Sequence, residues 1–235
     1  NTFIGDSAGR AVSSHTRNIA VGASALYSLA GMTNGSNNVA IGVNAMRNVV
    51  YGNRNVALGN EALRYIDGGY GENVAIGDSA AHRSQYDDNV AIGSSALLNA
   101  GISSGNIAVG TRALYMLRDP AAYMYTSNIA VGHNALYATR PTNLTNGRYN
   151  NAIGNYTLHR NTTGYSNNSF GQNAMYSNST GYENVGIGEF ALYFNTSGFR
   201  NIALGHNAGM ANTTGNANIL IGYEADVSAN NLSNA

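Results

Sequence analysis

The chain has 235 residues with 12 basic and 12 acidic side chains, so it carries no formal net charge, and every basic residue is an arginine. Only 10% of the residues are charged, against about 25% in an ordinary soluble domain, and a neutral chain without lysine lacks the clustered positive charge that nucleic-acid binding needs. Cysteine is absent, which excludes disulfides and thiolate metal sites, and no apolar run approaches the roughly 18 residues of a membrane span. We therefore expect neither a nucleic-acid partner nor membrane insertion.

A repeat of the form Asn-x-Ala-Ile-Gly covers the chain from end to end. Its glycine, called here the register glycine, recurs with a base period of 17 residues and occasional insertions. Repetition at a fixed period of this length is typical of solenoid proteins. The 13 register glycines are Gly5, Gly22, Gly42, Gly59, Gly77, Gly93, Gly110, Gly132, Gly154, Gly171, Gly188, Gly205 and Gly222.

Each copy predicts one short β-strand. The residue before the register glycine is always large and apolar, the residue three before it is Ile or Val in ten copies, and a small residue usually lies between them. Such alternation gives a strand one bulky face, which we expect to be buried, and one small face. Parallel stacking of the copies predicts an all-β, parallel β-solenoid (a β-roll) of 13 coils. Twelve steps of about 4.8 Å give a rod roughly 58 Å long.

Two features of the expected cross-section stay open. The pair Ala-Leu that often follows the register glycine, as in Ala96-Leu97, should form a second inward wall, either as a strand or as one helical turn. The small strand face permits close approach of another backbone. It is expected either to pack on the opposite wall of its own solenoid or, in a trimer, to lie against the threefold axis.

An asparagine stands four residues before every register glycine. Identical side chains at the same place in successive parallel coils form amide ladders, so a structural role is favoured over a catalytic or ligand-binding one. The predicted ladder consists of Asn18, Asn38, Asn55, Asn73, Asn89, Asn106, Asn128, Asn150, Asn167, Asn184, Asn201 and Asn218.

The motif Asn-Val-Ala-Ile-Gly-x-x-Ala-Leu, followed by Thr-Thr-Gly, resembles the repeats of bacteriophage tail-fibre proteins and similar trimeric bacterial surface fibres. It is also similar, more loosely, to the heads of trimeric autotransporter adhesins, whose coils are shorter. The resemblance covers residues 1–235. It implies an intimately packed homotrimer that attaches to a cell-surface glycan or protein receptor. It also implies an extracellular location, on a virion tail fibre or a bacterial cell-surface fibre.

The resemblance also divides the chain. Residues 1–222 form the expected solenoid, and residues 218–227 resemble the point where such fibres pass towards a self-cleaving C-terminal chaperone domain. Residues 223–235 are accordingly expected to be a transition segment, and the chain to be a piece of a longer fibre.

Insertions in a solenoid project as loops, often from the binding face. They are expected at 27–37, 115–127 and 137–149. The two longer ones contain Tyr, Arg and Asn residues, which recognise partners at low entropic cost. The predicted receptor-binding residues are Arg118, Asp119, Tyr123, Tyr125, Arg140, Arg148 and Tyr149. The alternative is that these segments are tolerated surface insertions that pack over each other.

Aromatic residues recur at two fixed positions of the repeat. One set lies five residues after the register glycine (Tyr27, Tyr115, Tyr137, Tyr176 and Tyr193), and the other lies six before it (Tyr165, Tyr182 and Phe199). Aromatic rings in register are expected to stack along the rod, which favours a structural role. An exposed ladder as a glycan-binding strip is the alternative.

No catalytic, metal or cofactor site is predicted. Glycan-cleaving enzymes use paired carboxylates, and the adjacent Asp87 and Asp88 point apart as strand or turn neighbours. The five histidines form no His-x-His pair, and the calcium-binding nonapeptide signature is missing. The sequence therefore predicts a structural and adhesive segment of a trimeric fibre that binds its receptor multivalently. A glycan-depolymerising enzyme and a monomeric solenoid spacer are the alternatives.

Overall fold

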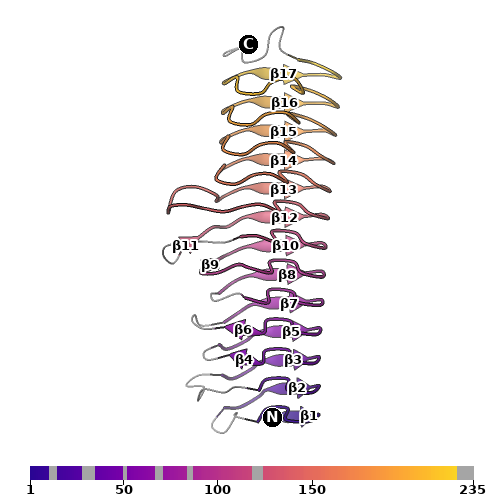
Figure 1. The fold of residues 1–235 in the computed structure, drawn as a ribbon, viewed down its shortest axis with the longest axis vertical. Coiled ribbons are helices and arrows are strands. Elements are labelled where there is room, and N and C mark those ends of the chain that lie inside the picture. Colours follow the sequence, from indigo (N-terminus) through magenta and orange to yellow (C-terminus); the bar gives the residue numbers. More distant parts are fainter. Residues whose placement is uncertain are drawn as a thin grey trace.

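The computed structural model describes residues 1–10, 15–27, 35–49, 52–66, 71–83, 87–117 and 124–226. This part of the chain consists of β-strands and turns and contains no helix that could cross a membrane. The chain winds into a parallel β-solenoid of about 11 turns, which stands as a long, narrow rod (Figure 1). The all-β, parallel-solenoid fold predicted from the repeat is confirmed.

One parallel sheet of 13 strands runs along the rod, and each repeat copy supplies one strand of three residues that ends directly before its register glycine. Neighbouring strands pair in register, so that Val74 lies beside Val90 and Ile76 beside Ile92. In spatial order the strands are β1 (Thr2–Ile4), β2 (Ile19–Val21), β3 (Val39–Ile41), β5 (Val56–Leu58), β7 (Val74–Ile76), β8 (Val90–Ile92), β10 (Ile107–Val109), β12 (Ile129–Val131), β13 (Asn151–Ile153), β14 (Asn168–Phe170), β15 (Val185–Ile187), β16 (Ile202–Leu204) and β17 (Ile219–Ile221).

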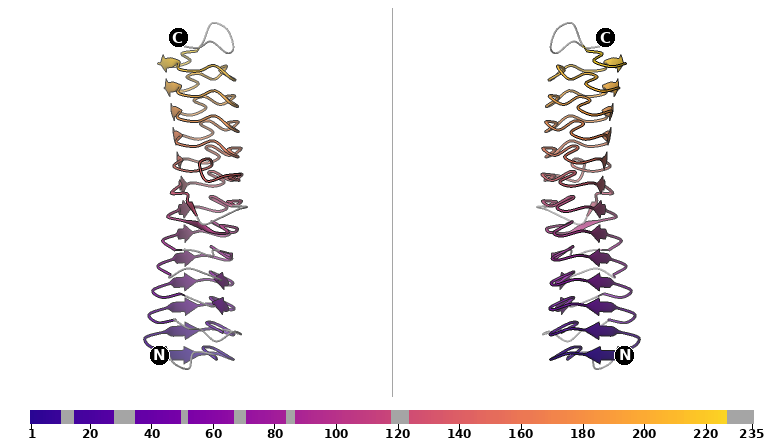
Figure 2. Two further views of the ribbon diagram at one scale, coloured as in Figure 1. Left: turned by 90° about the vertical axis from the view of Figure 1, so that its left-hand side faces the viewer. Right: turned by 90° about the vertical axis from the view of Figure 1, so that its right-hand side faces the viewer.

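Two short parallel pairs lie beside the main sheet: β4 (Asn48–Val49) with β6 (Tyr65–Ile66), and β9 (Ser103–Ser104) with β11 (Met124–Tyr125). The pair of β4 and β6 places Val49 and Ile66 in the core. Seen from the side, the strands near the N-terminus run across the view, the orange strands of the C-terminal half are seen nearly end-on, and the yellow strands beyond them point the opposite way (Figure 2). The coils therefore rotate progressively along the rod.

The faces of the main strands point the opposite way from the prediction. The small middle residues Ala75 and Ala91 are fully buried, whereas Ile76 and Ile92 are 38% and 37% exposed. The expectation that the bulky face is buried is wrong. The small face is not available for a threefold axis either, because it lies inside the chain's own solenoid.

The turn after the register glycine explains this reversal. It crosses behind the strand and fills the interior with its own Ala and Leu side chains, both fully buried in most coils, so only a methyl group fits on the strand's inner face. Where the copy has Gly186 instead of alanine, a methyl group built there would lie 2.9 Å from Cε of Met175. The methionine occupies the space that alanine fills elsewhere. The Ala-Leu pair does form the second inward wall, as predicted.

This inward wall is neither a strand nor a helical turn. Ser95 and Leu97 have φ of 56° and 52°, in the left-handed region, and equivalent residues of most other coils repeat this. The conformation costs about 1–2 kcal/mol per residue. It turns alternate N–H groups to opposite neighbouring coils. The amide of Ser95 donates to the carbonyl of Asp78 in the preceding coil, and that of Leu97 to the carbonyl of Ala113 in the next, both at 2.9 Å.

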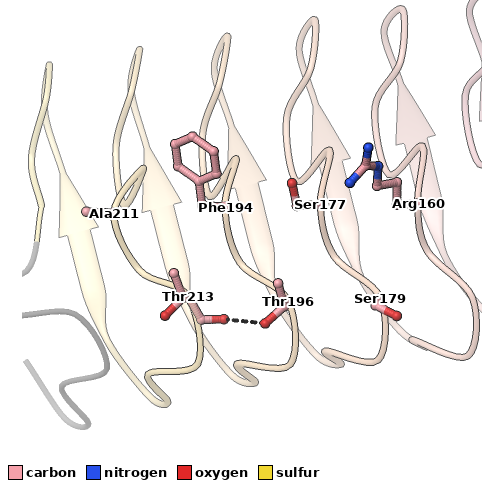
Figure 3. Close-up of a pocket in the computed structure, with 7 residues that line it drawn as sticks. All are labelled: Arg160, Ser177, Ser179, Phe194, Thr196, Ala211 and Thr213. Atoms are coloured by element: carbon pink, nitrogen blue, oxygen red, sulfur yellow. Dashed lines mark hydrogen bonds between the residues drawn. The ribbon is translucent and has the colours of Figure 1, made fainter.

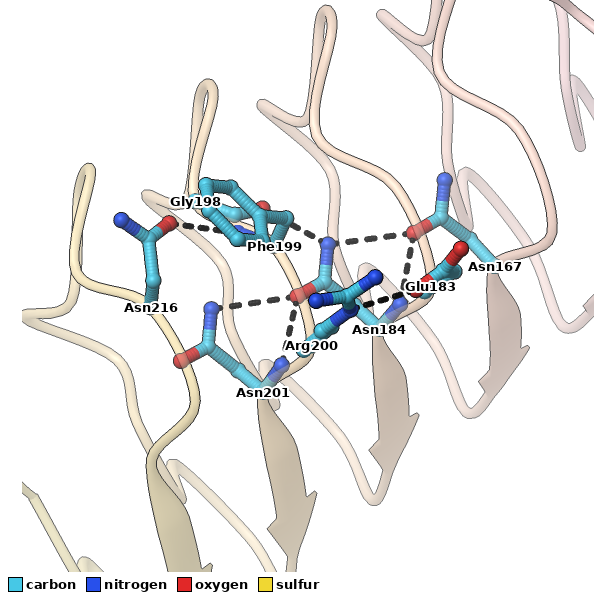
Figure 4. Close-up of polar contacts among 8 residues, drawn as sticks. All are labelled: Asn167, Glu183, Asn184, Gly198, Phe199, Arg200, Asn201 and Asn216. Atoms are coloured by element: carbon cyan, nitrogen blue, oxygen red, sulfur yellow. Dashed lines mark hydrogen bonds and ion pairs between the residues drawn. The ribbon is translucent and has the colours of Figure 1, made fainter. Parts of the chain in front are cut away.

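The asparagines before the strands form one buried column along the rod, part of which is shown in Figure 4. Each Oδ1 accepts the backbone N–H of the next asparagine at 2.8–3.1 Å, from Asn1 through to Asn218. Asn184 also donates from Nδ2 to Oδ1 of Asn167 at 3.1 Å and to the carbonyl of Gly198 at 2.8 Å. The ladder thus joins side chain to backbone as well as amide to amide, and it fastens the closing turn of each coil to the strand.

A register glycine inside the rod is expected to tolerate alanine far less well than the last one. Gly93 and Gly222 have nearly equal φ (128° and 130°), but only a Cβ on Gly93 would meet the next coil, 2.7 Å from the carbonyl carbon of Gly110. The Gly93→Ala variant should lose at least about 3 kcal/mol in the free energy of unfolding by urea, from clash and backbone strain together. Gly222→Ala, the matched control, should lose only the strain. Equal losses would contradict the steric role of the glycine column.

Removing one ladder side chain should destabilise the rod strongly. The Asn184→Ala variant leaves the buried N–H of Asn201 without its partner, whereas the carbonyl of Gly198 keeps its hydrogen bond from Nδ2 of Asn195; one unsatisfied buried group costs about 1–3 kcal/mol. We expect a loss of about 1–3 kcal/mol, measured by urea unfolding followed by circular dichroism. Ser197→Ala, an exposed change in a turn, serves as the control. A loss below about 1 kcal/mol in the free energy of unfolding would show that water replaces the amide at little cost.

Candidate binding surfaces

The outward face of the main sheet is a strip of aliphatic side chains, called here the aliphatic face. It consists of the residues three before and one before each register glycine, and it contains no charged residue. Its most exposed members away from the ends are Ile19, Ile41, Ile76, Ile92, Ile107, Ile153 and Ile187. Thirteen strands of three residues project about 580 Å². This lies near the upper end of the 300–600 Å² that the largest apolar patch of a monomer typically covers.

Polar residues interrupt this face at one place. Asn151 on β13 and Asn168 on β14 replace the aliphatic residue three before the glycine, and Nδ2 of Asn151 donates to Oδ1 of Asn168 at 2.7 Å. The two half-buried amides thus form one pair that crosses neighbouring strands. The aliphatic face therefore has a distinct polar mark towards its C-terminal half.

Aromatic rings stack along the rod at both predicted positions. In the column five residues after the register glycine, successive ring centroids of Tyr115, Tyr137, His159, Tyr176 and Tyr193 are 5.0–5.3 Å apart. In the column six before it, the rings of Tyr165, Tyr182 and Phe199 are 4.8 Å apart and nearly parallel. His159 is a member that the tyrosine pattern missed, and Tyr27 lies within reach of the guanidinium groups of Arg10 and Arg47 instead of another ring.

Stacking decides what these columns offer to a ligand. Each inner ring has both faces covered by its neighbours one coil away, so only ring edges and hydroxyl groups reach the surface. A sugar that stacks on an aromatic ring needs an open ring face. The interior of the column is therefore a structural element.

The predicted receptor-binding residues fall into two groups. Arg118, Asp119 and Tyr123 lie outside the described residues. Of the others, Tyr125, Arg140, Arg148 and Tyr149 are exposed or half-exposed on the two longest coils. The segment between β12 and β13, which carries three of these four, reaches beyond its neighbours on the left of Figure 1. Their role in receptor binding stays a prediction.

The structure separates Arg140 from the pair Arg148 and Tyr149. Arg140 lies eight residues after its register glycine, and its backbone N–H donates to the carbonyl of Thr162, the corresponding residue of the next coil, at 2.8 Å. Arg148 belongs to the column of Tyr165, and its guanidinium carbon lies 5.0 Å from the ring centroid of Tyr149. The insert therefore contributes to two neighbouring columns of the rod.

A groove runs along the outside of the C-terminal coils. It has a volume of about 660 Å³, within the range of ligand-binding pockets. Two columns line it, six and eight residues after the register glycine (Figure 3). The first contributes Arg160, Ser177, Phe194 and Ala211, and the second Ser179, Thr196 and Thr213. The groove was not predicted, because the recurring Ser and Thr residues were expected only to form turns. Their repetition at one fixed position of the repeat is the feature of the sequence that indicates a column along the rod.

Phe194 differs from the stacked aromatics. The residue is 46% exposed, and its ring stands at 89° to the ring of Tyr193, with the centroids 4.8 Å apart. Its neighbours one coil away in the same column are small, Ser177 and Ala211, and Figure 3 shows the ring face-on above the groove. It is the groove's aromatic surface.

One of the two adjacent carboxylates, Asp87, takes part in a backbone contact. Oδ1 of Asp87 accepts the backbone N–H of Gly71 at 2.8 Å, which gives this carboxylate a structural partner. Within the described ranges, no three His, Asp or Glu side chains are grouped as metal ligands.

Comparison with known proteins gives no assignment. No family model matches the chain, and neither does any curated protein or any solved structure. The aliphatic face, the inserts and the groove are accordingly the features of the molecule that bear on function.

The aromatic column should make stability depend on pH. Burial lowers the pKa of His159 below 6.5, and the nearby charges of Arg160 and His133 lower it further, against the hydrogen bond to the carbonyl of Asn134. The unfolded chain therefore binds this proton first, and stability falls as pH falls below 6.5. In the His159→Phe variant, the free energy of unfolding should decrease less between pH 7.5 and pH 5 than in the wild type.

The control for this experiment is Tyr137→Phe, which changes a ring of the same stacked column and leaves His159 in place. Its pH dependence should equal that of the wild type. The remaining pH dependence common to all three proteins includes His82, whose pKa burial also lowers. A His159→Phe variant with the wild-type pH dependence would contradict the assignment.

Proposed function

We propose that the chain is a structural and adhesive segment of a trimeric extracellular fibre. The observation that carries this proposal is the uncharged aliphatic face, which extends over all 13 strands of the main sheet. The rod then has 13 coils, one per repeat copy. Its setting is a virion tail fibre or a bacterial surface fibre, as the sequence resemblance implies.

The aliphatic face supports association with further copies of the same chain. The row of Ile and Val side chains that follows the turning strands along the rod gains free energy when it is removed from water, about 25 cal/mol per Å². It meets no charged side chain in either of its columns. Three such rods with these faces turned inward would bury the apolar strip completely. The buried alanines, in contrast, stay within each chain.

The amide pair of Asn151 and Asn168 supports a defined alignment of the copies. In coiled coils, one polar residue in an apolar interface fixes the register at some cost in stability. Here the pair interrupts the aliphatic face at one height along the rod. When the three copies are in register, the amide pairs of the copies lie at the same height and meet one another. When a copy is shifted, its amides are buried against isoleucine and valine of its neighbours, which costs free energy.

Adhesion follows from the same arrangement. Three copies carry the exposed side chains of the inserts, Tyr125, Arg140, Arg148 and Tyr149, at one height on the fibre. Binding of one site raises the effective concentration of the others, so weak sites together hold a receptor on a cell surface firmly.

Light scattering of the purified chain at low micromolar concentration tests the proposal. We expect a mass near three chains for the wild type. The double variant Ile76→Asp, Ile92→Asp places two charges on the aliphatic face and should shift the mass to one chain, while the circular dichroism spectrum keeps its β-sheet signature. The cost of burying an unpaired charge gives the physical reason.

Thr180→Asp together with Ser197→Asp is the matched control, because these exposed residues also lie on adjacent coils but in a turn away from the strip. This double variant should keep the mass of three chains. A one-chain mass for the wild type would overturn the trimer and favour the monomeric spacer. An unchanged mass after the isoleucine substitutions would place the interface elsewhere.

A further inference from the structure

We propose that the groove lined by Arg160, Ser177 and Phe194 binds an extended chain of acidic sugars that runs parallel to the rod. This inference deepens the proposed adhesive function and depends on it for its biological setting. It assigns the ligand class to a surface outside the predicted receptor-binding residues.

The shape of the groove selects an extended ligand. Its lining residues come from four successive coils, three steps of about 4.8 Å, so it spans about 14 Å along the rod. Across the rod it is bounded by columns only two residues apart in the sequence, such as Ser177 and Ser179. A chain molecule of several small rings fits such a groove lengthwise. A volume of about 660 Å³ holds a short oligosaccharide.

The ring of Phe194 provides the stacking surface. Sugar rings have an apolar face of C–H groups that packs on an aromatic ring, and this requires a ring whose face is open. The stacked tyrosines fail this requirement, whereas Phe194 stands at right angles to Tyr193 and projects between the small residues Ser177 and Ala211. One sugar placed over Phe194 leaves the space over Ser177 for the next.

Arg160 provides the charge preference. It lies two coils before Phe194, on the far side of Ser177, and it is exposed. Its guanidinium carbon lies 5.3 Å from the ring centroid of Tyr176, a cation–π distance that helps to hold the side chain in place. No Asp or Glu of the described residues forms an ion pair with it, unlike Arg54, Arg64 and Arg200. A sugar carboxylate matches the guanidinium as a bidentate partner.

The second column supplies hydroxyl groups in register. Thr162, Ser179, Thr196 and Thr213 follow one another coil by coil, joined by backbone hydrogen bonds of 2.7–2.9 Å. The Oγ1 of Thr196 donates to the carbonyl of Thr213 at 3.1 Å (Figure 3), which leaves the lone pairs of this oxygen as acceptors for sugar hydroxyls. Arg140 occupies the same position one coil before Thr162. A longer acidic chain would meet this second arginine beyond Arg160.

Isothermal titration calorimetry with a purified oligogalacturonate, and with a neutral cello-oligosaccharide of the same length, tests the inference. The wild-type chain should bind the oligogalacturonate more tightly, with an affinity that falls as salt is added. Phe194→Ala should weaken binding of the acidic sugar at least about tenfold. Arg160→Gln should weaken it by about tenfold at low salt and remove most of the preference over the neutral sugar.

Tyr223→Ala is the control, since it removes an exposed aromatic ring from a different column and should leave binding unchanged. Light scattering and circular dichroism on each variant distinguish the two proposals. A wild-type chain with a three-chain mass that binds neither sugar overturns the groove and leaves the fibre intact. So does a Phe194→Ala variant with wild-type affinity. A one-chain mass with binding that Phe194→Ala abolishes supports the groove and overturns the trimer.

Discussion

The close stacking of identical backbone positions constrains everything else in this molecule. In the described part of the chain, backbone hydrogen bonds join corresponding positions of successive coils, so a residue there must tolerate its equivalent about 4.8 Å away. Glycine at the register position meets this requirement because a Cβ would meet the carbonyl group of the next coil. Asparagine meets it because its amide has both a donor and an acceptor, and one therefore satisfies the next.

The same constraint accounts for the sparse charge. Equal charges about 4 Å apart repel by roughly 1 kcal/mol even in water, so a column of like charges accumulates strain at every step. The chain keeps few charged residues and pairs some of them across coils, as Glu183 and Arg200 do at 2.7 Å. Aromatic rings face no such penalty, because stacked rings at this spacing attract one another.

Where a column repeats the same side chain, neighbouring copies cover each other's binding groups. We therefore expect position-specific recognition where a different residue interrupts a column. The tyrosine column covers its own ring faces, but Phe194 stands alone between Ser177 and Ala211 and keeps its ring open. Beyond the terminal Thr2, the aliphatic face is apolar except at Asn151 and Asn168, where a polar pair marks one height. Each exception interrupts a column at a single place, so each can specify a position along the rod.

The sequence by itself determined the solenoid, the strand in each coil, and which residues form the asparagine and aromatic columns. A single strand of three residues cannot bury a face alone, and a strict period allows successive strands to do so by parallel stacking. It did not determine which strand face points inward. That depended on the turn after the register glycine, whose left-handed residues, such as Ser95 and Leu97, bring Ala and Leu close behind the strand and leave space for only a methyl group. The groove, too, arose only in three dimensions, because its two columns come from four coils, and the orientation of Phe194 depends on the stacked rings beside it. Periodicity fixes which residues are neighbours, whereas the width of the interior decides which of them face solvent.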